Sequence, residues 1–114
     1  MSMSVIVPQK GDPGPYPLQN AASDGNGAAL DADGVGSMGF YITFDEDAVS
    51  GAVQIETGVF PDDSYAWAPL GDPIEASPGG IEQVTVPGPL AFVRARISVP
   101  ITGGTVTVVA FVTY

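Results

Sequence analysis

The chain contains no cysteine and no histidine among its 114 residues. Without cysteine it can form neither a disulfide framework nor a thiolate metal site. Without histidine it also lacks the commonest general base and a main ligand for zinc and copper, which leaves carboxylate, hydroxyl and lysine chemistry. We therefore expect a protein that is not an enzyme and that has no cofactor.

Positive charge is scarce as well. Three Lys and Arg residues stand against 13 Asp and Glu residues, which gives a net charge of -10. Such a surface repels nucleic-acid phosphates and anionic lipids, so we expect neither nucleic acid nor membrane as a partner. No apolar run approaches the roughly 20 residues of a spanning helix, and the first residues lack the pattern of a secretory signal. We expect synthesis in the cytoplasm.

No segment has helical periodicity, whereas alternation of apolar and polar residues is widespread. The 15 glycines and 11 prolines separate short apolar segments, and a hydrophobic content of 45% favours a packed core over disorder. This pattern predicts one all-β domain, an antiparallel sandwich of the jelly-roll type. The predicted strands are residues 1–7, two short strands beside a turn at 23–27, and residues 37–44, 51–59, 65–68, 81–86, 90–102 and 105–114. In the strand at 37–44, one face should carry Phe40, Ile42 and Phe44 and the other Tyr41 and Thr43. In the strand at 51–59, Val53 and Ile55 should point inward and Gln54 and Glu56 outward.

The last 25 residues carry the clearest alternation. Val93, Ala95, Ile97 and Val99 should share one face of the first segment, towards the core, as should Val106, Val108, Ala110 and Val112 in the second. The glycine pair at 103–104 predicts a hairpin between them. Two of the three basic residues, Arg94 and Arg96, would then stand on its outward face.

Residues 1–17 are predicted to form an extended N-terminal arm before a sandwich domain at 18–114. Four prolines between residues 8 and 17 exclude a helix, because proline lacks the amide donor and favours extended geometry in the residue before it. An arm that contacts a partner and a simple leader without a partner would have the same composition.

Acidic clusters offer only weak candidates for chemistry. Asp31, Asp33 and Gly34 resemble the start of a calcium loop, but the later ligands are missing, so a surface turn is the prediction. Residues 45–47 are expected to form a solvated turn. Asp62 and Asp63 are adjacent, so their side chains should diverge instead of forming an acid and base pair.

Basic and aromatic residues offer two binding hypotheses. Arg94 and Arg96 either pair across the sheet with Glu56 or Glu82, or contact a neighbouring acidic subunit. Tyr65 and Trp67 either pack in the core or a subunit contact, or form a platform on which a sugar ring stacks.

Taken in order, the segments 19–43, 51–67 and 92–109 resemble a recurrent module in structural proteins of tailed bacteriophages. The module has a start rich in Gln, Asn and Gly, a strand with a glutamate before an acidic turn and a tryptophan, and a late strand with two arginines. The matching positions are Gln19, Asn20, Gly25, Gly27, Glu56, Asp62, Asp63, Trp67, Val93, Arg94, Arg96 and Gly104.

The resemblance implies a non-enzymatic β-sandwich of the virion, above all a decoration or cement protein on the outer capsid surface. Its partners would be the major capsid protein and other copies of itself, with a homotrimer favoured. The residues we expect at the capsid or subunit interface are Pro8, Lys10, Pro13, Tyr16, Arg94 and Arg96. The alternatives are a carbohydrate- or receptor-binding module of a head or tail fibre, with Tyr65 and Trp67 as the platform, and a tail or connector component.

Overall fold

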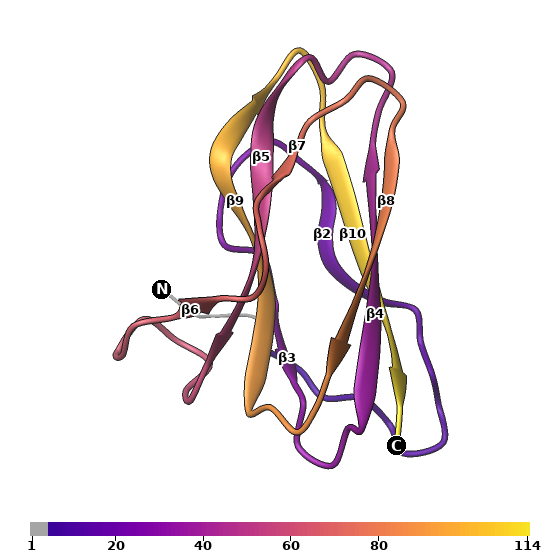
Figure 1. The fold of residues 1–114 in the computed structure, drawn as a ribbon, viewed down its shortest axis with the longest axis vertical. Coiled ribbons are helices and arrows are strands. Elements are labelled where there is room, and N and C mark those ends of the chain that lie inside the picture. The colour runs from indigo at the N-terminus through magenta and orange to yellow at the C-terminus, as the bar shows by residue number, and fades with distance from the viewer. Residues whose placement is uncertain (1–4) are drawn as a thin grey trace.

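A computed structural model describes residues 5–114, and these residues form strands and loops without a helix. Two sheets face each other across one apolar core (Figure 1). The prediction of an all-β sandwich is therefore confirmed. No helix in the described part of the chain is long and apolar enough to cross a membrane.

Ten strands make up the two sheets. One sheet has the order β2-β10-β4-β8, and the other has the order β1-β3-β9-β5-β6, with β7 also paired to β5. All neighbouring strands are antiparallel except β1 and β3. The strands are β1 Val5–Ile6, β2 Tyr16–Ala22, β3 Ala29–Asp31, β4 Ser37–Phe44, β5 Ser50–Gly58, β6 Ala68–Pro69, β7 Ile74–Glu75, β8 Ile81–Pro87, β9 Phe92–Thr102 and β10 Val106–Thr113.

The alternation of apolar residues identifies the core face of the long strands correctly. In β4, Phe40, Ile42 and Phe44 are buried, as predicted, and Tyr41 points outward. The predicted inward set of β10 is buried as well, as are Val53 and Ile55 of β5. In β9 the prediction holds for Val93, Ala95 and Ile97 but is wrong for Val99, which is 54% exposed, because the pairing of β9 with β5 has an irregularity between Ile97 and Val99 that ends the simple alternation. A period of two fixes the face of a strand because successive side chains point to opposite sides of a sheet.

The predicted hairpin between residues 90 and 114 is wrong. β9 pairs with β3 and β5, whereas β10 pairs with β2 and β4, so the turn at Gly103 and Gly104 carries the chain from one sheet to the other (Figure 1). Gly103 has a φ of 83°, and a side chain there would collide with the carbonyl oxygen of Asp47. These glycines therefore serve a tight crossing between sheets, which has the same local sequence signal as a hairpin turn.

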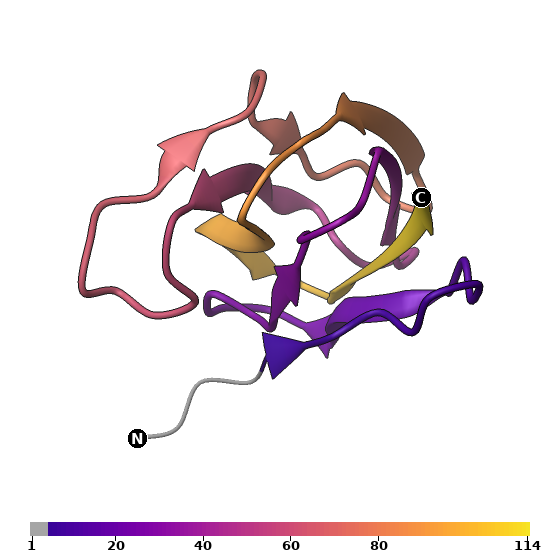
Figure 2. The ribbon, with the colours of Figure 1, turned by 90° about the horizontal axis from the view of Figure 1, so that it is seen from below.

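The N-terminal segment lies on the sandwich, so the expectation of a separate extended arm is not met by its described residues. Tyr16 and Pro17 belong to β2, and β1 adds to the edge of β3. The loop between β1 and β2 runs back beside β2 (Figure 2) and accepts a hydrogen bond at the carbonyl of Pro13 from the Val112 amide, 2.9 Å. Prolines exclude a helix but do not decide whether a segment leaves the domain. Residues 1–4 of the expected arm and edge strand lie outside the described part.

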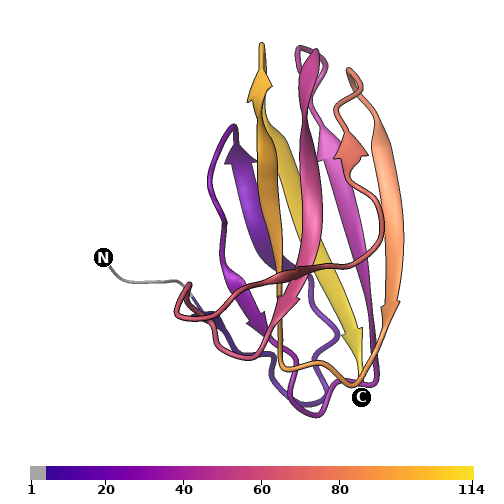
Figure 3. The ribbon, with the colours of Figure 1, turned by 60° about the vertical axis from the view of Figure 1, so that its left-hand side comes forward.

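A second departure concerns the outer face of β5 and β9. Gln54 and Glu56 were expected to be exposed there, but both are buried, with exposed fractions of 6% each. Of the predicted strand at 65–68, only Ala68 lies in a strand, the two-residue β6. The loop at 59–67 before it folds over this face. Figure 3 shows β6, at the end of this loop, and the chain that follows it passing in front of β5 and β9. The covering loop is what creates a candidate site.

Candidate functional site

Arg94 and Glu56 form a buried ion pair beneath the loop at 59–67. They are cross-strand neighbours in β9 and β5, and Arg94 Nε donates to Glu56 Oε1 at 2.9 Å. Both side chains are less than a tenth exposed. The second carboxylate oxygen, Oε2, accepts from Nε of Arg96 at 3.2 Å. Of the two partners proposed for the arginines, Glu56 is therefore the one found, and Glu82 is not.

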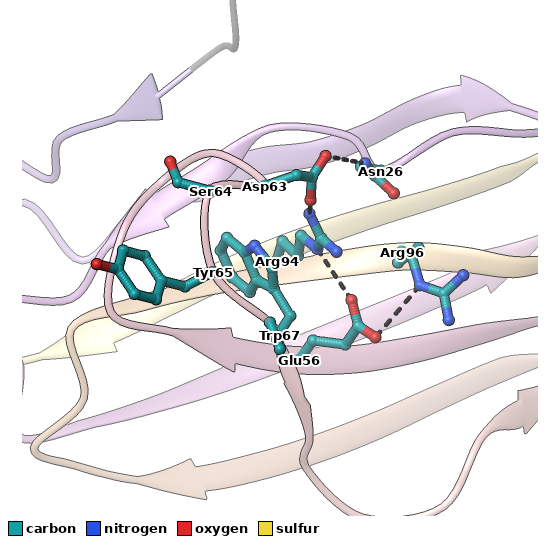
Figure 4. Close-up of a pocket in the computed structure, with 9 residues that line it drawn as sticks. Asn26, Glu56, Asp63, Ser64, Tyr65, Trp67, Arg94 and Arg96 are labelled. Carbon is teal, nitrogen blue, oxygen red and sulfur yellow. Dashed lines mark hydrogen bonds and ion pairs between the residues drawn. The ribbon is translucent and has the colours of Figure 1, made fainter.

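The loop supplies two further contacts to Arg94. Asp63 Oδ1 accepts from Arg94 Nη1 at 2.9 Å, and the guanidinium carbon of Arg94 lies 4.1 Å from the ring centroid of Trp67 (Figure 4). A cation over an indole face contributes about 0.5–2 kcal/mol, more when it is shielded from water. Arg94 thus fastens the loop to the sheet, and its burial removes it from the set of residues that could contact a neighbouring subunit.

Trp67 is held from two sides. Its Nε1 donates to the carbonyl of Asp62 at 2.9 Å, and a side chain at Gly58 would approach its ring to within 2.9 Å. The carboxylate of Asp62 accepts from the backbone amide and hydroxyl of Ser64, and these hydrogen bonds lower the pKa of Asp62. Asp62 and Asp63 therefore diverge, as expected for neighbours in a turn.

The surface left open beside this network is a polar hollow of about 480 Å³, which we call the arginine hollow. Arg96, whose side chain is 39% exposed, contributes its two terminal nitrogens, which make no hydrogen bond to any residue from 5 to 114. Asn26 lies across from it, 3.4 Å from Oδ2 of Asp63. The hollow is lined by Asn26, Glu56, Asp63, Ser64, Tyr65, Ala66, Trp67, Arg94 and Arg96.

Tyr65 and Trp67 do not form the continuous platform that the sequence suggested. Tyr65 is 62% exposed and stacks on Phe60, with ring centroids 5.0 Å apart and planes 25° from parallel. Trp67 is half-buried and engaged with Arg94. The exposed aromatic pair is therefore Phe60 and Tyr65. Sequence reasoning missed Phe60 because it lies outside any strand pattern.

The outer face of the four-stranded sheet is a second candidate surface, which we call the uncharged face. Register places the outward residues of β10, β4 and β8 in four cross-strand rows of three: Thr107, Thr43 and Ile81; Val109, Tyr41 and Gln83; Phe111, Gly39 and Thr85; and Thr113, Ser37 and Pro87. None of them carries a charge. The one charged residue of these strands, Glu82, pairs with the buried Ile42 and so lies on the core side of the edge.

Two aromatic side chains stand near the centre of the uncharged face. Tyr41 and Phe111 are 43% and 38% exposed and meet edge to face, with centroids 5.7 Å apart. A hollow of about 440 Å³ lies on one side of Phe111 beside Gly39 and Gln83. A smaller one, about 220 Å³, is shared by Phe111, Thr85 and Pro13. The sequence showed that both aromatics point outward, but only the pairing of β4 with β10 brings them together.

The remaining residues predicted at an interface differ in how far they are buried. Tyr16 is buried, and its hydroxyl donates to the carbonyl of Asp12 at 2.6 Å, so it supports the fold and is not available to a partner. Pro8 is half-buried. Lys10 and Pro13 are exposed in the loop between β1 and β2, and Pro13 borders the uncharged face.

The acidic motif at Asp31 and Asp33 forms a turn, in which the carboxylate of Asp31 accepts from the amide of Asp33 at 3.0 Å. Across residues 5–114, no three carboxylate, imidazole or thiolate side chains are grouped so as to hold a metal ion. No family model, curated protein or solved structure matches this chain. Function must therefore be argued from the two surfaces.

Proposed function

We propose that this chain is a non-enzymatic structural protein of a tailed-phage virion, a decoration protein that binds between major capsid subunits on the outer surface and stabilises the shell. The observation that carries the proposal is the uncharged face. A molecule with a net charge of -10 keeps the outward side of β10, β4 and β8 free of charge and places two exposed aromatic residues near the centre of this surface.

Such a face suits a protein partner. The central part of a protein interface is depleted of charged residues and enriched in aromatic ones, because burying an unpaired charge costs more than burying an apolar or neutral polar group. A partner that covers Tyr41 and Phe111 would not have to displace water from a charged side chain. Glu56 is buried under the loop at 59–67, whereas most of the other acidic residues lie in exposed loops and at sheet edges, where they remain in water and keep unrelated copies apart.

We further propose that the sandwich is a jelly roll. If β1 is left out, the first strand, β2, and the last strand, β10, are neighbours in one sheet. The second strand, β3, and the second-last strand, β9, are neighbours in the other sheet. This nesting of early and late strands is what two Greek keys produce, and double-sheet jelly rolls are frequent in viral capsid proteins. The order of strands therefore supports a virion role.

Stabilisation of the shell would arise from many weak contacts. A protein that bridges neighbouring capsid subunits adds contact area that must be broken before the lattice opens, and symmetry repeats this contribution at every equivalent site. No single contact has to be strong for the sum to be large.

The test is co-sedimentation of the purified protein with capsids that lack it, together with the heat stability of the same particles. We expect saturable binding at a fixed ratio to capsid subunits and a raised disruption temperature. Sedimentation of the free protein measures whether it forms the trimer that the resemblance implies. Absence of binding to such capsids would contradict the decoration role.

A further inference from the structure

We infer that the arginine hollow is a binding site for a neutral saccharide, independent of the uncharged face. The two surfaces belong to different sheets, so one molecule could use both. The inference rests on the charges within the hollow, the donors and acceptors that it leaves free, the exposed aromatic ring at its rim and the rigidity of its loop.

The charges in and around the arginine hollow argue against an ionic ligand. Arg94 and Arg96 are balanced by Glu56 and Asp63, so the hollow has no net formal charge, and the rest of the molecule is strongly acidic. An anion would be repelled by the surrounding field, and the carboxylates that could attract a cation are already paired with guanidinium groups. A neutral polar ligand remains.

The hydrogen-bonding groups suit a ligand that both donates and accepts. The terminal nitrogens of Arg96 are donors without a partner among the described residues, and the Asn26 side chain offers a donor and an acceptor. Among residues 5–114, Oδ2 of Asp63 accepts only the long hydrogen bond of 3.4 Å from Asn26, so it can accept a stronger one. Adjacent hydroxyl groups of a sugar ring, each a donor and an acceptor, match this mixture.

Tyr65 supplies the apolar contact. Sugar rings present a face of C–H groups that packs on an aromatic ring. Tyr65 lines the hollow and is 62% exposed, and its ring points outward, away from Arg96 (Figure 4). The Phe60 ring stacks on Tyr65 and restricts its motion. With a volume of about 480 Å³, the hollow lies within the range of about 300–1,000 Å³ typical of small-ligand sites.

The loop that carries these groups is held in place before any ligand arrives. Arg94 binds Asp63, Asp62 accepts hydrogen bonds from Ser64, and Trp67 donates to the Asp62 carbonyl. Binding therefore requires little ordering of the protein, which favours affinity.

The experiment is an amide-shift titration by NMR of the full chain with neutral hexasaccharides of glucose, mannose, galactose and N-acetylglucosamine, and with a hexamer of galacturonate as the charged comparison. We expect at least one neutral oligosaccharide to bind with a Kd of about 1 mM or tighter. The shifts should be confined to residues 26, 56–67 and 94–96. Failure of every neutral oligosaccharide, or preference for the charged hexamer, would overturn the inference.

Substitutions locate the site. Tyr65→Ala should weaken binding about tenfold, because it removes the stacking surface from an exposed position. Tyr41→Ala removes an aromatic ring of similar exposure from the other sheet and should leave the Kd unchanged. Equal loss of affinity in both variants, or none in Tyr65→Ala, would place the saccharide elsewhere and contradict the assignment. Capsid binding of Tyr65→Ala should be unchanged, so the two functions can be tested separately.

Discussion

At the scale of single residues, Glu56 is the centre of the only ion-pair network found among residues 5–114. It accepts from both arginines while being 6% exposed, and no buried side-chain nitrogen or oxygen in the described residues lacks a partner. Because the network is buried, the loss of one buried member should strongly lower the stability of the protein. A buried charge is tolerated only while its partners remain, because the cost of removing it from water is otherwise uncompensated.

We therefore predict that Glu56→Ala lowers the free energy of unfolding by about 3–5 kcal/mol, since it leaves Arg94 buried with one partner. Asp63→Ala removes an acceptor that is 62% exposed from the same arginine and should cost about 1 kcal/mol or less. Urea unfolding followed by tryptophan fluorescence measures both. Equal effects of the two substitutions would show that burial does not set the strength of this network.

Gly27 is a second residue whose role is local and steric. Its φ is 69°, and a side chain there would collide with the carbonyl oxygen of Leu18 and come within 2.6 Å of Nε2 of Gln19. That amide nitrogen donates to the carbonyl oxygens of Ala95 and Gly25, 2.8 and 3.1 Å away. Gln19, Gly25 and Gly27 of the resembled motif thus join the loop at 23–27 to β9.

Gly34 provides the control for this position, because it has a φ of 79° with no atom within 4 Å of where a side chain would start. Gly34→Ala should cost about 1–2 kcal/mol for backbone strain alone. Gly27→Ala should cost at least about 1 kcal/mol more, because it adds a collision to the same strain. Thermal unfolding compares the two variants, and equal losses of stability would argue against a steric role for Gly27.

At the scale of elements, one end of the sandwich is joined by the Asp45 carboxylate. Its Oδ2 accepts from the amide of Thr105 at 3.0 Å and from the hydroxyl of the same residue, while Oδ1 accepts from the amide of Asp47. The turn after β4 is thereby linked to the crossing between β9 and β10. These hydrogen bonds, that from the Thr105 amide above all, lower the pKa of Asp45.

A lowered pKa in the folded state gives this link a defined pH dependence. Its contribution to stability is present above the ordinary aspartate value of 3.8 and is lost as the pH falls through the lower folded value. We predict that Asp45→Asn lowers the unfolding temperature at neutral pH and that its difference from the native protein shrinks below about pH 4. Asp24→Asn, in another loop, is the control and should show a smaller difference. If the difference in unfolding temperature between Asp45→Asn and the native protein stayed constant from neutral pH to below about pH 4, the charge of Asp45 would not be what stabilises this link.

The elements also show what the sequence could predict. Alternation identified the long strands and their core faces, because burial of one face is a local property of a strand. It could not identify partners, so residues 90–114 were assigned to one sheet when they belong to two. It also placed Gln54, Glu56 and Arg94 on an exposed face, since nothing local signals that the loop at 59–67 folds back over them. Glu56 was one of two partners proposed for the arginines, but the burial of the Arg94–Glu56 pair was not predicted.

At the scale of the whole molecule, charge is distributed unevenly over the two sheets. One outer face is covered by a loop fastened through buried ion pairs and carries the arginine hollow. The other is uncharged, open and centred on Tyr41 and Phe111. We expect the second face to meet the capsid, because it is the broad surface that a partner can cover without desolvating a charge.

The most direct test of this account compares capsid binding of the native protein with that of Thr85→Asp and Val49→Asp. Thr85 is exposed within the uncharged face, next to Phe111, and Val49 is exposed at the turn between β4 and β5. Each variant adds the same charge, and circular dichroism checks that both remain folded. The account predicts that Thr85→Asp weakens saturable binding to capsids at least about tenfold, since it buries an unpaired charge, while Val49→Asp binds as the native protein does. Equal binding by all three proteins would contradict it.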